Sequence, residues 1–270
     1  MAETTRSDHQ PVHGDLAERV RQGQALLACG AGTAGRLAGT GETEWLRSLD
    51  GVDLLACPTV EQAQKLAADH GLSHQTILDQ VVILASAAED EGAAEVERVH
   101  GTLFDLIGTC YDTLIDRERN RSNIAELYGI LQICDGHRGP VLDFGCGTGI
   151  SMSVAGRPDE MYGWDRSAQM RSIAATSGLR IVHVASAEGL PEQAFAGALA
   201  SYVFDLPTAP DAVGPLLRSL RPGGALVANF HRDKNLAQVT RDAADHGGQV
   251  TVHRRDDRHG SMLSIRRVAD

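Results

Sequence analysis

The sequence predicts an α/β fold in which a doubly wound, mostly parallel sheet of seven strands follows an α-helical region. Two observations carry this prediction. Up to about residue 120, apolar residues recur mostly at helical spacing. From about residue 138, short β-rich runs alternate with helical stretches, which is the pattern of parallel strands joined by helical crossovers.

The first half of the chain is expected to contain a polar tail and helices. Residues 1–13 are expected to form a flexible tail, and residues 14–118 an α-helical cap or dimerisation region. Helical spacing occurs in VEQAQKLAADHG, SHQTILDQVVILASAAEDE and AAEVERVHGTLFDLIGTCYDTLIDRER. Thr59 and Ser73 precede two of these segments, where a side-chain oxygen can cap the first turn of a helix.

Part of this half, TVEQAQKLAADHGLSHQTILDQVVIL, has the outline of a helix-turn-helix. The segment that would read DNA, SHQTILDQ, contains no lysine or arginine. DNA recognition is therefore not expected.

Residues 119–270 are expected to form the domain that carries the sheet. Five apolar runs predict its strands in chain order, namely PVLDF, EMYGW, RIVHVA, GALASYVF and GALVANF. Two further runs, QVTVHRRD and SMLSIRRVA, lie on either side of DRHG and predict an antiparallel pair at the end of the chain.

A first glycine cluster at residues 25–39 has the pattern G-x-G-x-x-G in Gly30, Gly32 and Gly35. A phosphate-binding loop needs a buried strand before it and an intact helix after it, because the helix N-terminus supplies N–H groups. RVRQGQALLA reads as helix as readily as strand, and Gly39 and Gly41 interrupt the segment after the cluster. We therefore expect a glycine-rich helical hairpin at these residues.

A second cluster, VLDFGCGTGIS at residues 141–151, follows the clear strand PVLDF, and Asp143 lies near the end of that strand. About twenty residues further on, MYGWDRSAQM supplies Asp165 at the expected end of the second strand, where an acid can accept hydrogen bonds from ribose hydroxyls. This cluster is the better candidate for a nucleotide site.

With VASAEGLPE and SLRPGGALVANFH following in order, residues 120 to 270 resemble the class I S-adenosylmethionine-dependent methyltransferases. The resemblance implies a Rossmann-like domain with S-adenosylmethionine as its cofactor. It implies that Asp165 binds the ribose, while Arg166 and Met170 flank the adenine. It places the remaining contacts to the cofactor, chiefly to its amino-acid part, at Asp143, the backbone of Gly145, Cys146 and Gly147, and Ser201.

The chain departs from the family pattern at two positions. Many members have an aspartate after the third strand that bonds the adenine amine, where this chain has Ser186. Adenine recognition then falls to Ser186 or to the backbone of Ala187 and Glu188. At the fourth strand, Ala196 stands where relatives often have an acid.

Methyl transfer from a sulfonium needs mainly alignment, with a base only where the acceptor must lose a proton. Three residues are candidates for contact with the reacting groups. His231 ends the fifth strand, with surface capping as its alternative role, and Tyr202 lies at the end of the fourth, with core packing as its alternative. Tyr111 resembles the tyrosine that many relatives fold over the cofactor, although its helix could simply pack against the sheet.

Composition limits the partners. A net charge of −11 disfavours the binding of a nucleic-acid backbone, which requires lysine and arginine. The five cysteines form no C-x-x-C pair, so neither disulfides nor a metal site are expected, and reduced thiols are typical of the cytoplasm. The polar start and the lack of an apolar run of ~20 residues predict no export signal and no membrane partner.

The predicted function is methyl transfer to a small-molecule acceptor, in keeping with secondary metabolism, by a homodimer whose helical half covers the site. One alternative is another reaction of the same cofactor, in which its own amine displaces at the sulfonium carbon and releases methylthioadenosine. A second alternative is a cofactor-binding or DNA-binding regulator without turnover.

Overall fold

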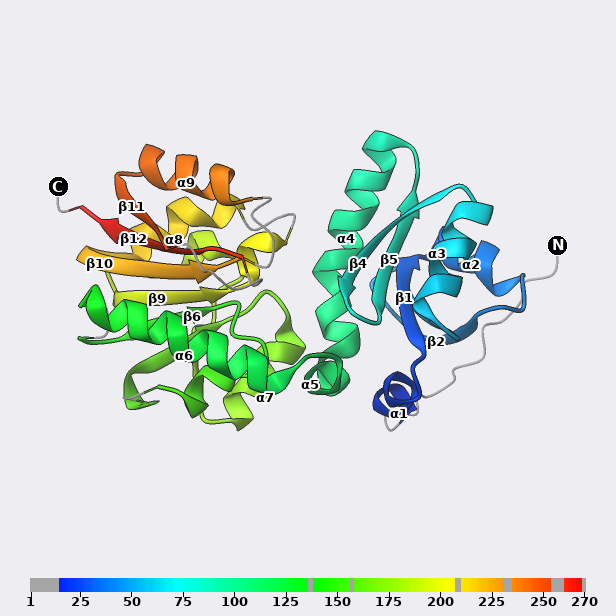
Figure 1. Cartoon of the computed structure of the whole chain (residues 1–270), viewed down its shortest axis with the longest axis horizontal. Helices are drawn as coiled ribbons and strands as arrows, with labels where there is room; N and C mark the ends of the chain where they lie inside the picture. Colours follow the sequence, from blue (N-terminus) through cyan, green and yellow to red (C-terminus); the bar gives the residue numbers. More distant parts are fainter. Residues whose placement is uncertain are drawn as a thin grey trace. The chain divides into compact units, whose positions relative to one another are not determined.

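The computed structural model describes residues 15–135, 138–155, 158–206, 210–230, 235–253 and 260–268 (Figure 1). The chain divides into two compact units, Met1–Ile115 and Asp116–Asp270. The boundary expected between residues 118 and 119 falls inside helix α6 (Arg117–Ile133), which belongs to the second unit. The tail expected over residues 1–13 lies outside the described residues.

The N-terminal unit is built on a five-stranded sheet with the strand order β2-β3-β1-β5-β4. Strand β1 pairs parallel to β5 and antiparallel to β3. The elements in chain order are α1 (Asp15–Arg21), β1 (Ala25–Gly30), α2 (Ala31–Ala38), β2 (Glu44–Leu49), β3 (Val52–Cys57), α3 (Val60–Asp69), β4 (Leu72–Leu78), β5 (Val81–Ser86), α4 (Glu89–Ile107) and α5 (Tyr111–Leu114).

The prediction of an α-helical region over residues 14–118 is therefore wrong. Strands β1 and β3 are buried at every position, and β5 at all but its last. A strand that is covered on both faces is apolar throughout, so it lacks the alternation by which a half-buried strand is recognised. Such a run cannot be distinguished from a buried helix by periodicity.

Helices cover both faces of this sheet (Figure 1). Leu26 and Ala28 of β1 pack with α1 and α4, whereas Leu27 and Cys29 pack with α2 and α3. The predicted cap at Thr59 is confirmed, since its hydroxyl accepts from the N–H of Gln62 at 3.2 Å. The cap predicted at Ser73 is wrong, because this residue lies in β4, which pairs antiparallel with β5 in place of the second helix of a helix-turn-helix.

The C-terminal unit confirms the predicted sheet, which has seven strands in the order β11-β12-β10-β9-β6-β7-β8. The strands from β10 to β8 are parallel, while β11 and β12 form the predicted antiparallel pair. The elements after α6 are β6 (Val141–Phe144), β7 (Met161–Trp164), α7 (Ala168–Thr176), β8 (Arg180–Ile181), β9 (Phe195–Ser201), α8 (Val213–Ser219), β10 (Leu220–Asn229), α9 (Leu236–Asp245), β11 (Gly248–His253) and β12 (Met262–Arg267).

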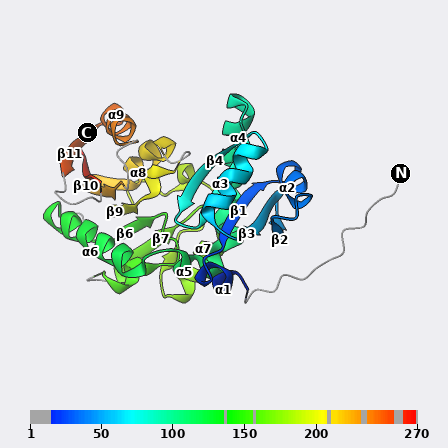
Figure 2. The same ribbon diagram turned by 45° about the vertical axis from the view of Figure 1, so that its right-hand side comes forward.

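Alternating side chains of the central strands enter two different cores. Ala225 and Val227 of β10 pack on the side of α6, and Leu226 and Ala228 on the side of α8 and α9 (Figure 2). Helix α7 joins the core on the α6 side through Ala174. Because the strands from β10 to β8 are parallel, their carboxyl ends lie at the same edge of the sheet, and the candidate site lies there.

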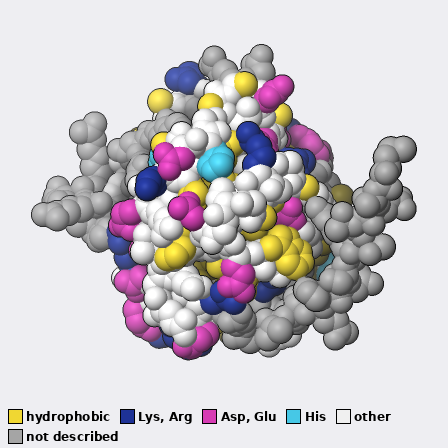
Figure 3. All heavy atoms as spheres, turned by 90° about the vertical axis from the view of Figure 1, so that its right-hand side faces the viewer, with side chains coloured by type: hydrophobic (Ala, Val, Ile, Leu, Met, Phe, Trp, Pro, Cys, Tyr) yellow, Lys and Arg dark blue, Asp and Glu magenta, His cyan; other side chains and the backbone are white. Residues whose placement is uncertain are grey.

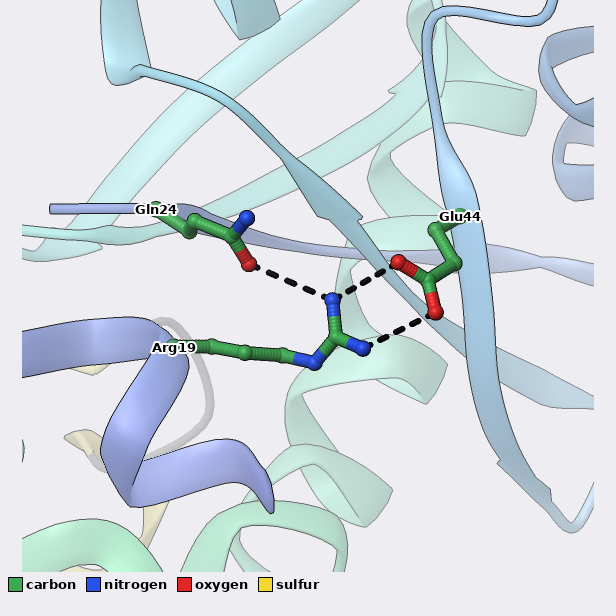
Figure 4. Close-up of polar contacts among 3 residues, drawn as sticks. All are labelled: Arg19, Gln24 and Glu44. Atoms are coloured by element: carbon green, nitrogen blue, oxygen red, sulfur yellow. Dashed lines mark hydrogen bonds and ion pairs between the residues drawn. The ribbon is translucent and has the colours of Figure 1, made fainter. Parts of the chain in front are cut away.

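Charged side chains of both signs are interspersed over the face of the molecule that Figure 3 shows. One pairing ties the first helix of the N-terminal unit to its sheet (Figure 4). The guanidinium of Arg19 donates to both oxygens of Glu44 at 2.7 and 2.9 Å, and to the side chain of Gln24 at 3.3 Å. Within the described ranges, no helix has the length and hydropathy needed to cross a bilayer.

Candidate functional site

Three of the predicted site residues lie at the carboxyl ends of three neighbouring parallel strands, β9, β6 and β7. In open α/β sheets this edge forms the crevice in which ligands bind. Asp143 lies within β6, Asp165 directly follows β7, and Ser201 ends β9. His231, predicted at the end of β10, lies outside the described residues.

The loop after β6 is a tight turn whose backbone conformation favours glycine at three positions. Gly145, Gly147 and Gly149 have φ angles of 73°, 51° and 83°. A Cβ atom on Gly145 would collide with Cγ2 of Val203. The N–H groups of Gly145 and Cys146 donate to the carbonyl of Trp164 at 2.7 and 3.0 Å, which ties the loop to the end of β7. At the three glycines the backbone carries no side chain, which allows the close approach of a ligand.

Asp165 is held beside this glycine loop by two backbone hydrogen bonds. Its Oδ2 accepts from the N–H of Gly147 at 2.9 Å, and its Oδ1 accepts from the N–H of Ser167 at 2.8 Å. Ser167 in turn caps α7, because its hydroxyl accepts from the N–H of Met170 at 3.0 Å. The carboxylate is thus fixed in position at the junction of the loop and α7.

Asp143 is a buried acid close to a second one, with 3% of its surface exposed. Burial raises its pKa to about 6, the nearby Ser151 side chain opposes this rise, and the Asp165 carboxylate adds to it. Two neighbouring carboxylates favour a cationic group between them, because a positive charge offsets their repulsion. The same surroundings, burial first, raise the pKa of the Cys146 thiol and keep it neutral.

The secondary structure around the two glycine clusters differs from the prediction. The second cluster is followed by a single 3-10 turn, Ile150–Ser153, in place of an intact helix. The first cluster does have the buried strand β1 before it and the helix α2 after it, so the expectation of a helical hairpin is wrong.

An internal carboxylate occupies the helix N-terminus at the first cluster. Oε1 of Glu95 accepts from the N–H of Gly30 at 3.1 Å and from the hydroxyl of Thr33 at 3.3 Å, and Oε2 accepts from the N–H of Ser86 at 2.8 Å. Donors that could face a phosphate are thus bonded within the protein. Gly35 is exposed on α2, so it does not serve the close contact between helix and strand that the motif's last glycine allows.

Sequence reasoning missed a polar network at the ends of β9 and β10. Tyr202 has φ 59°, a left-handed conformation that is rare for a bulky residue. Its N–H donates to Oδ1 of Asn229 at 2.8 Å, and its hydroxyl accepts from Nδ2 of Asn123 in α6 at 2.6 Å. Both asparagines are buried. The available signal was one amide at the end of the otherwise apolar run GALVANF.

Residues 142–228 match the family model of a methyltransferase domain. The C-terminal unit therefore contains a methyltransferase domain. Its cofactor is S-adenosylmethionine. The residues of the site fit this cofactor, since Asp165 presents a carboxylate beside the glycine loop, at the edge where a ribose would bind.

Solved structures resemble the chain in fold. A methyltransferase of Thermotoga maritima, described as a possible histamine N-methyltransferase, is 15% identical with a TM-score of 0.48, over 61% of this chain and 98% of that one. The magnesium protoporphyrin IX methyltransferase of Synechocystis is 17% identical with a TM-score of 0.43, over 56% and 79%. An amino pentose methyltransferase of Micromonospora echinaspora is 15% identical with a TM-score of 0.45, over 53% and 90%. No curated protein matches the chain.

The residues predicted around the adenine lie after β7 and β8 of the methyltransferase domain. Arg166 is exposed, whereas Met170 is buried. Ser186 precedes the 3-10 turn Ala187–Gly189, and the side chain of Glu188 pairs with Arg218 at 2.6 Å. Because this pair occupies the Glu188 carboxylate, an adenine contact from this residue would use its backbone.

Tyr111 belongs to the N-terminal unit rather than to the methyltransferase domain. Its ring lies edge-on to Phe104 of α4, with ring centroids 6.1 Å apart, and it packs against the core of that unit. Its predicted role over the cofactor stays a prediction.

Proposed function

We propose that this protein transfers the methyl group of S-adenosylmethionine to a small-molecule acceptor. The observation that carries the proposal is the meeting of two carboxylates, Asp143 and Asp165, with a glycine loop at the carboxyl ends of adjacent parallel strands. This combination suits a ligand with ribose hydroxyls at one end and a cationic amino-acid group at the other.

Each acid has a separate part in holding the cofactor. Asp165 would accept hydrogen bonds from the ribose hydroxyls. Asp143 would face the ammonium group directly or through water, and the backbone of Gly145, Cys146 and Gly147 would line the amino-acid part.

The bound cofactor supplies an activated methyl group on a positively charged sulfur. The chain's own residues then have to align the acceptor with that methyl and exclude water. Arg166 and Met170 would flank the adenine, with Ser186 and the backbone of Ala187 and Glu188 at its edge. Tyr202 is the candidate for contact with the reacting groups among the described residues, with Tyr111 and His231 as further candidates.

A small molecule is the acceptor class that the charge distribution favours. The net charge is −11, which disfavours binding to a phosphate backbone, and on the one face that Figure 3 shows basic side chains are interspersed with acidic ones. All five cysteines are free, which fits a reducing cytoplasm. Trp45 and Leu49 are 44% and 38% exposed on the edge strand β2, which fits a homodimer contact through the N-terminal unit.

Product analysis tests the proposal. The protein is incubated with S-adenosylmethionine, with and without a metabolite extract, and the products are identified by mass spectrometry. Adenosylhomocysteine formed only with the extract supports methyl transfer. Methylthioadenosine would indicate the intramolecular reaction instead, and binding in calorimetry without either product would indicate a regulator.

A further inference from the structure

Oγ of Ser201 and Nδ2 of Asn229 are two buried polar atoms at the carboxyl ends of β9 and β10. Ser201 and Asn229 are paired across the parallel ladder, so their side chains leave the sheet on the same face. Asn229 is fully buried, and the Oγ atom of Ser201 is closed from solvent. In the part of the chain that the structure describes, neither this Oγ nor Nδ2 of Asn229 has a hydrogen-bond partner.

The orientation of the Asn229 amide is fixed by its neighbour. A backbone N–H can only donate, so the group that faces the N–H of Tyr202 at 2.8 Å must be the amide oxygen. The NH2 group therefore points elsewhere, as a donor held in place without an acceptor. A buried donor in this condition is unfavourable for folding, and such groups in native proteins call for an explanation.

A second unfavourable feature lies in the same network. Tyr202 has a left-handed backbone conformation. Its N–H is hydrogen-bonded to Asn229 and its hydroxyl to Asn123. Strained residues that the surroundings hold in place cluster at ligand-binding sites. The unpartnered polar atoms of Ser201 and Asn229 and the strained backbone of Tyr202 are thus two independent observations that indicate a binding site at this edge of the sheet.

The order of the strands bears on whether the ligand at Ser201 and Asn229 is the cofactor or the methyl acceptor. Along the edge, Asp165 follows β7 and the glycine loop follows β6, while Ser201 and Asn229 end the next two strands on the other side of β6. A cofactor held at Asp165 and the glycine loop would therefore lie beside those strand ends.

We infer that Ser201 and Asn229 form a subsite for the methyl acceptor, and that the acceptor presents an oxygen atom to it. This inference rests on the proposed function. An amide NH2 requires a lone pair, which a hydroxyl, carbonyl or carboxylate oxygen offers and a protonated amine does not. Both atoms are closed from solvent, so entry of the acceptor requires a neighbour to move, and Tyr202 is bonded directly to Asn229. This inference assigns the hydroxyl of Ser201 to the acceptor, in place of the contact with the cofactor that the family resemblance implies.

Two variants separate binding from folding. Ser201→Ala removes an unpartnered hydroxyl, so the melting temperature should stay the same or rise. Asn229→Asp keeps an oxygen for the N–H of Tyr202 but loses the donor. The matched control is Ser219→Ala in α8, because the buried hydroxyl of Ser219 donates to the carbonyl of Leu216 at 2.7 Å and its loss should lower the melting temperature without changing turnover.

The assay uses S-adenosylmethionine with a trideuterated methyl group, a metabolite extract, and mass spectrometry of adenosylhomocysteine and of the labelled product. Both site variants should bind adenosylhomocysteine in calorimetry within about twofold of the wild type, while turnover falls at least about tenfold, the loss expected of one hydrogen bond to substrate. The labelled product should contain an oxygen-bearing acceptor.

Three results would overturn the inference. Unchanged turnover in both variants would show that the pair does not touch the acceptor. A matching loss of affinity for adenosylhomocysteine would place the pair in the cofactor site. A labelled product without oxygen would refute the acceptor class. Absence of any product from the wild type is a different failure, because it contradicts the proposed function itself.

Discussion

Replacing Asp143 by asparagine should stabilise the C-terminal unit at neutral pH while it weakens the cofactor site. The side chain is 3% exposed on β6, and folding therefore removes a carboxylate from water. Asparagine has nearly the same shape, but it carries no charge.

The size of the effect follows from the pKa shift. Burial raises the pKa of Asp143 from 3.8 to about 6. Between these values the folded state binds the proton more tightly than the unfolded state, so stability falls as the pH rises through this window. At about 1.4 kcal/mol for each unit of pKa, the full cost above pH ~6 is about 3 kcal/mol. The variant avoids this cost, and its advantage should vanish below pH ~4, where the acid is protonated in both states.

The measurement is urea unfolding of wild type and variant without ligand between pH 4 and pH 8. The chain has two tryptophans, Trp45 in the N-terminal unit and Trp164 in the C-terminal unit, where it stacks on Phe144 at 4.9 Å between ring centroids. In a Trp45→Phe background, fluorescence therefore reports unfolding around Asp143 alone.

A difference in the free energy of unfolding between wild type and variant that does not change with pH would refute the reasoning. Ionisation of Asp143 would then have no effect on stability. The matched control is Asp245→Asn on the exposed face of α9, which should show no pH-dependent difference. Calorimetry with S-adenosylmethionine completes the test. The wild type should lose affinity as the pH falls below about 6, since protonation removes the charge that faces the ammonium group.

Asp165→Ala should weaken S-adenosylmethionine binding at least tenfold in calorimetry, since charge-assisted hydrogen bonds contribute about 1.5–3 kcal/mol, and an unchanged dissociation constant in a folded variant would refute the ribose contact. Gly147→Ala should abolish binding because its φ of 51° strains alanine, whereas Gly32→Ala, in open space on α2, should leave affinity unchanged, and the reverse result would mean that the first cluster is the cofactor loop. Removal of residues 1–115, or Tyr111→Ala, should lower turnover strongly while the melting temperature changes little. If the truncated and full-length proteins are equally active, dimerisation is the remaining role of the N-terminal unit.

The sequence by itself determined the methyltransferase domain. The run PVLDF, the glycines after it and Asp165 about twenty residues later lie on one continuous stretch, and their roles depend on local turn geometry and on strand order. The antiparallel pair at the end of the chain was equally local, because its two strands lie next to each other in sequence.

Only the tertiary structure decided the nature of the N-terminal unit and the polar network of the site. Strands β1, β3 and β5 take their conformation from neighbours on both faces, which periodicity does not record. Glu95 reaches the N–H of Gly30 across 65 positions of sequence, and Asn123 reaches the hydroxyl of Tyr202 across 79. Such contacts arise from packing between elements that are distant in the chain, so no spacing rule within a single segment could predict them.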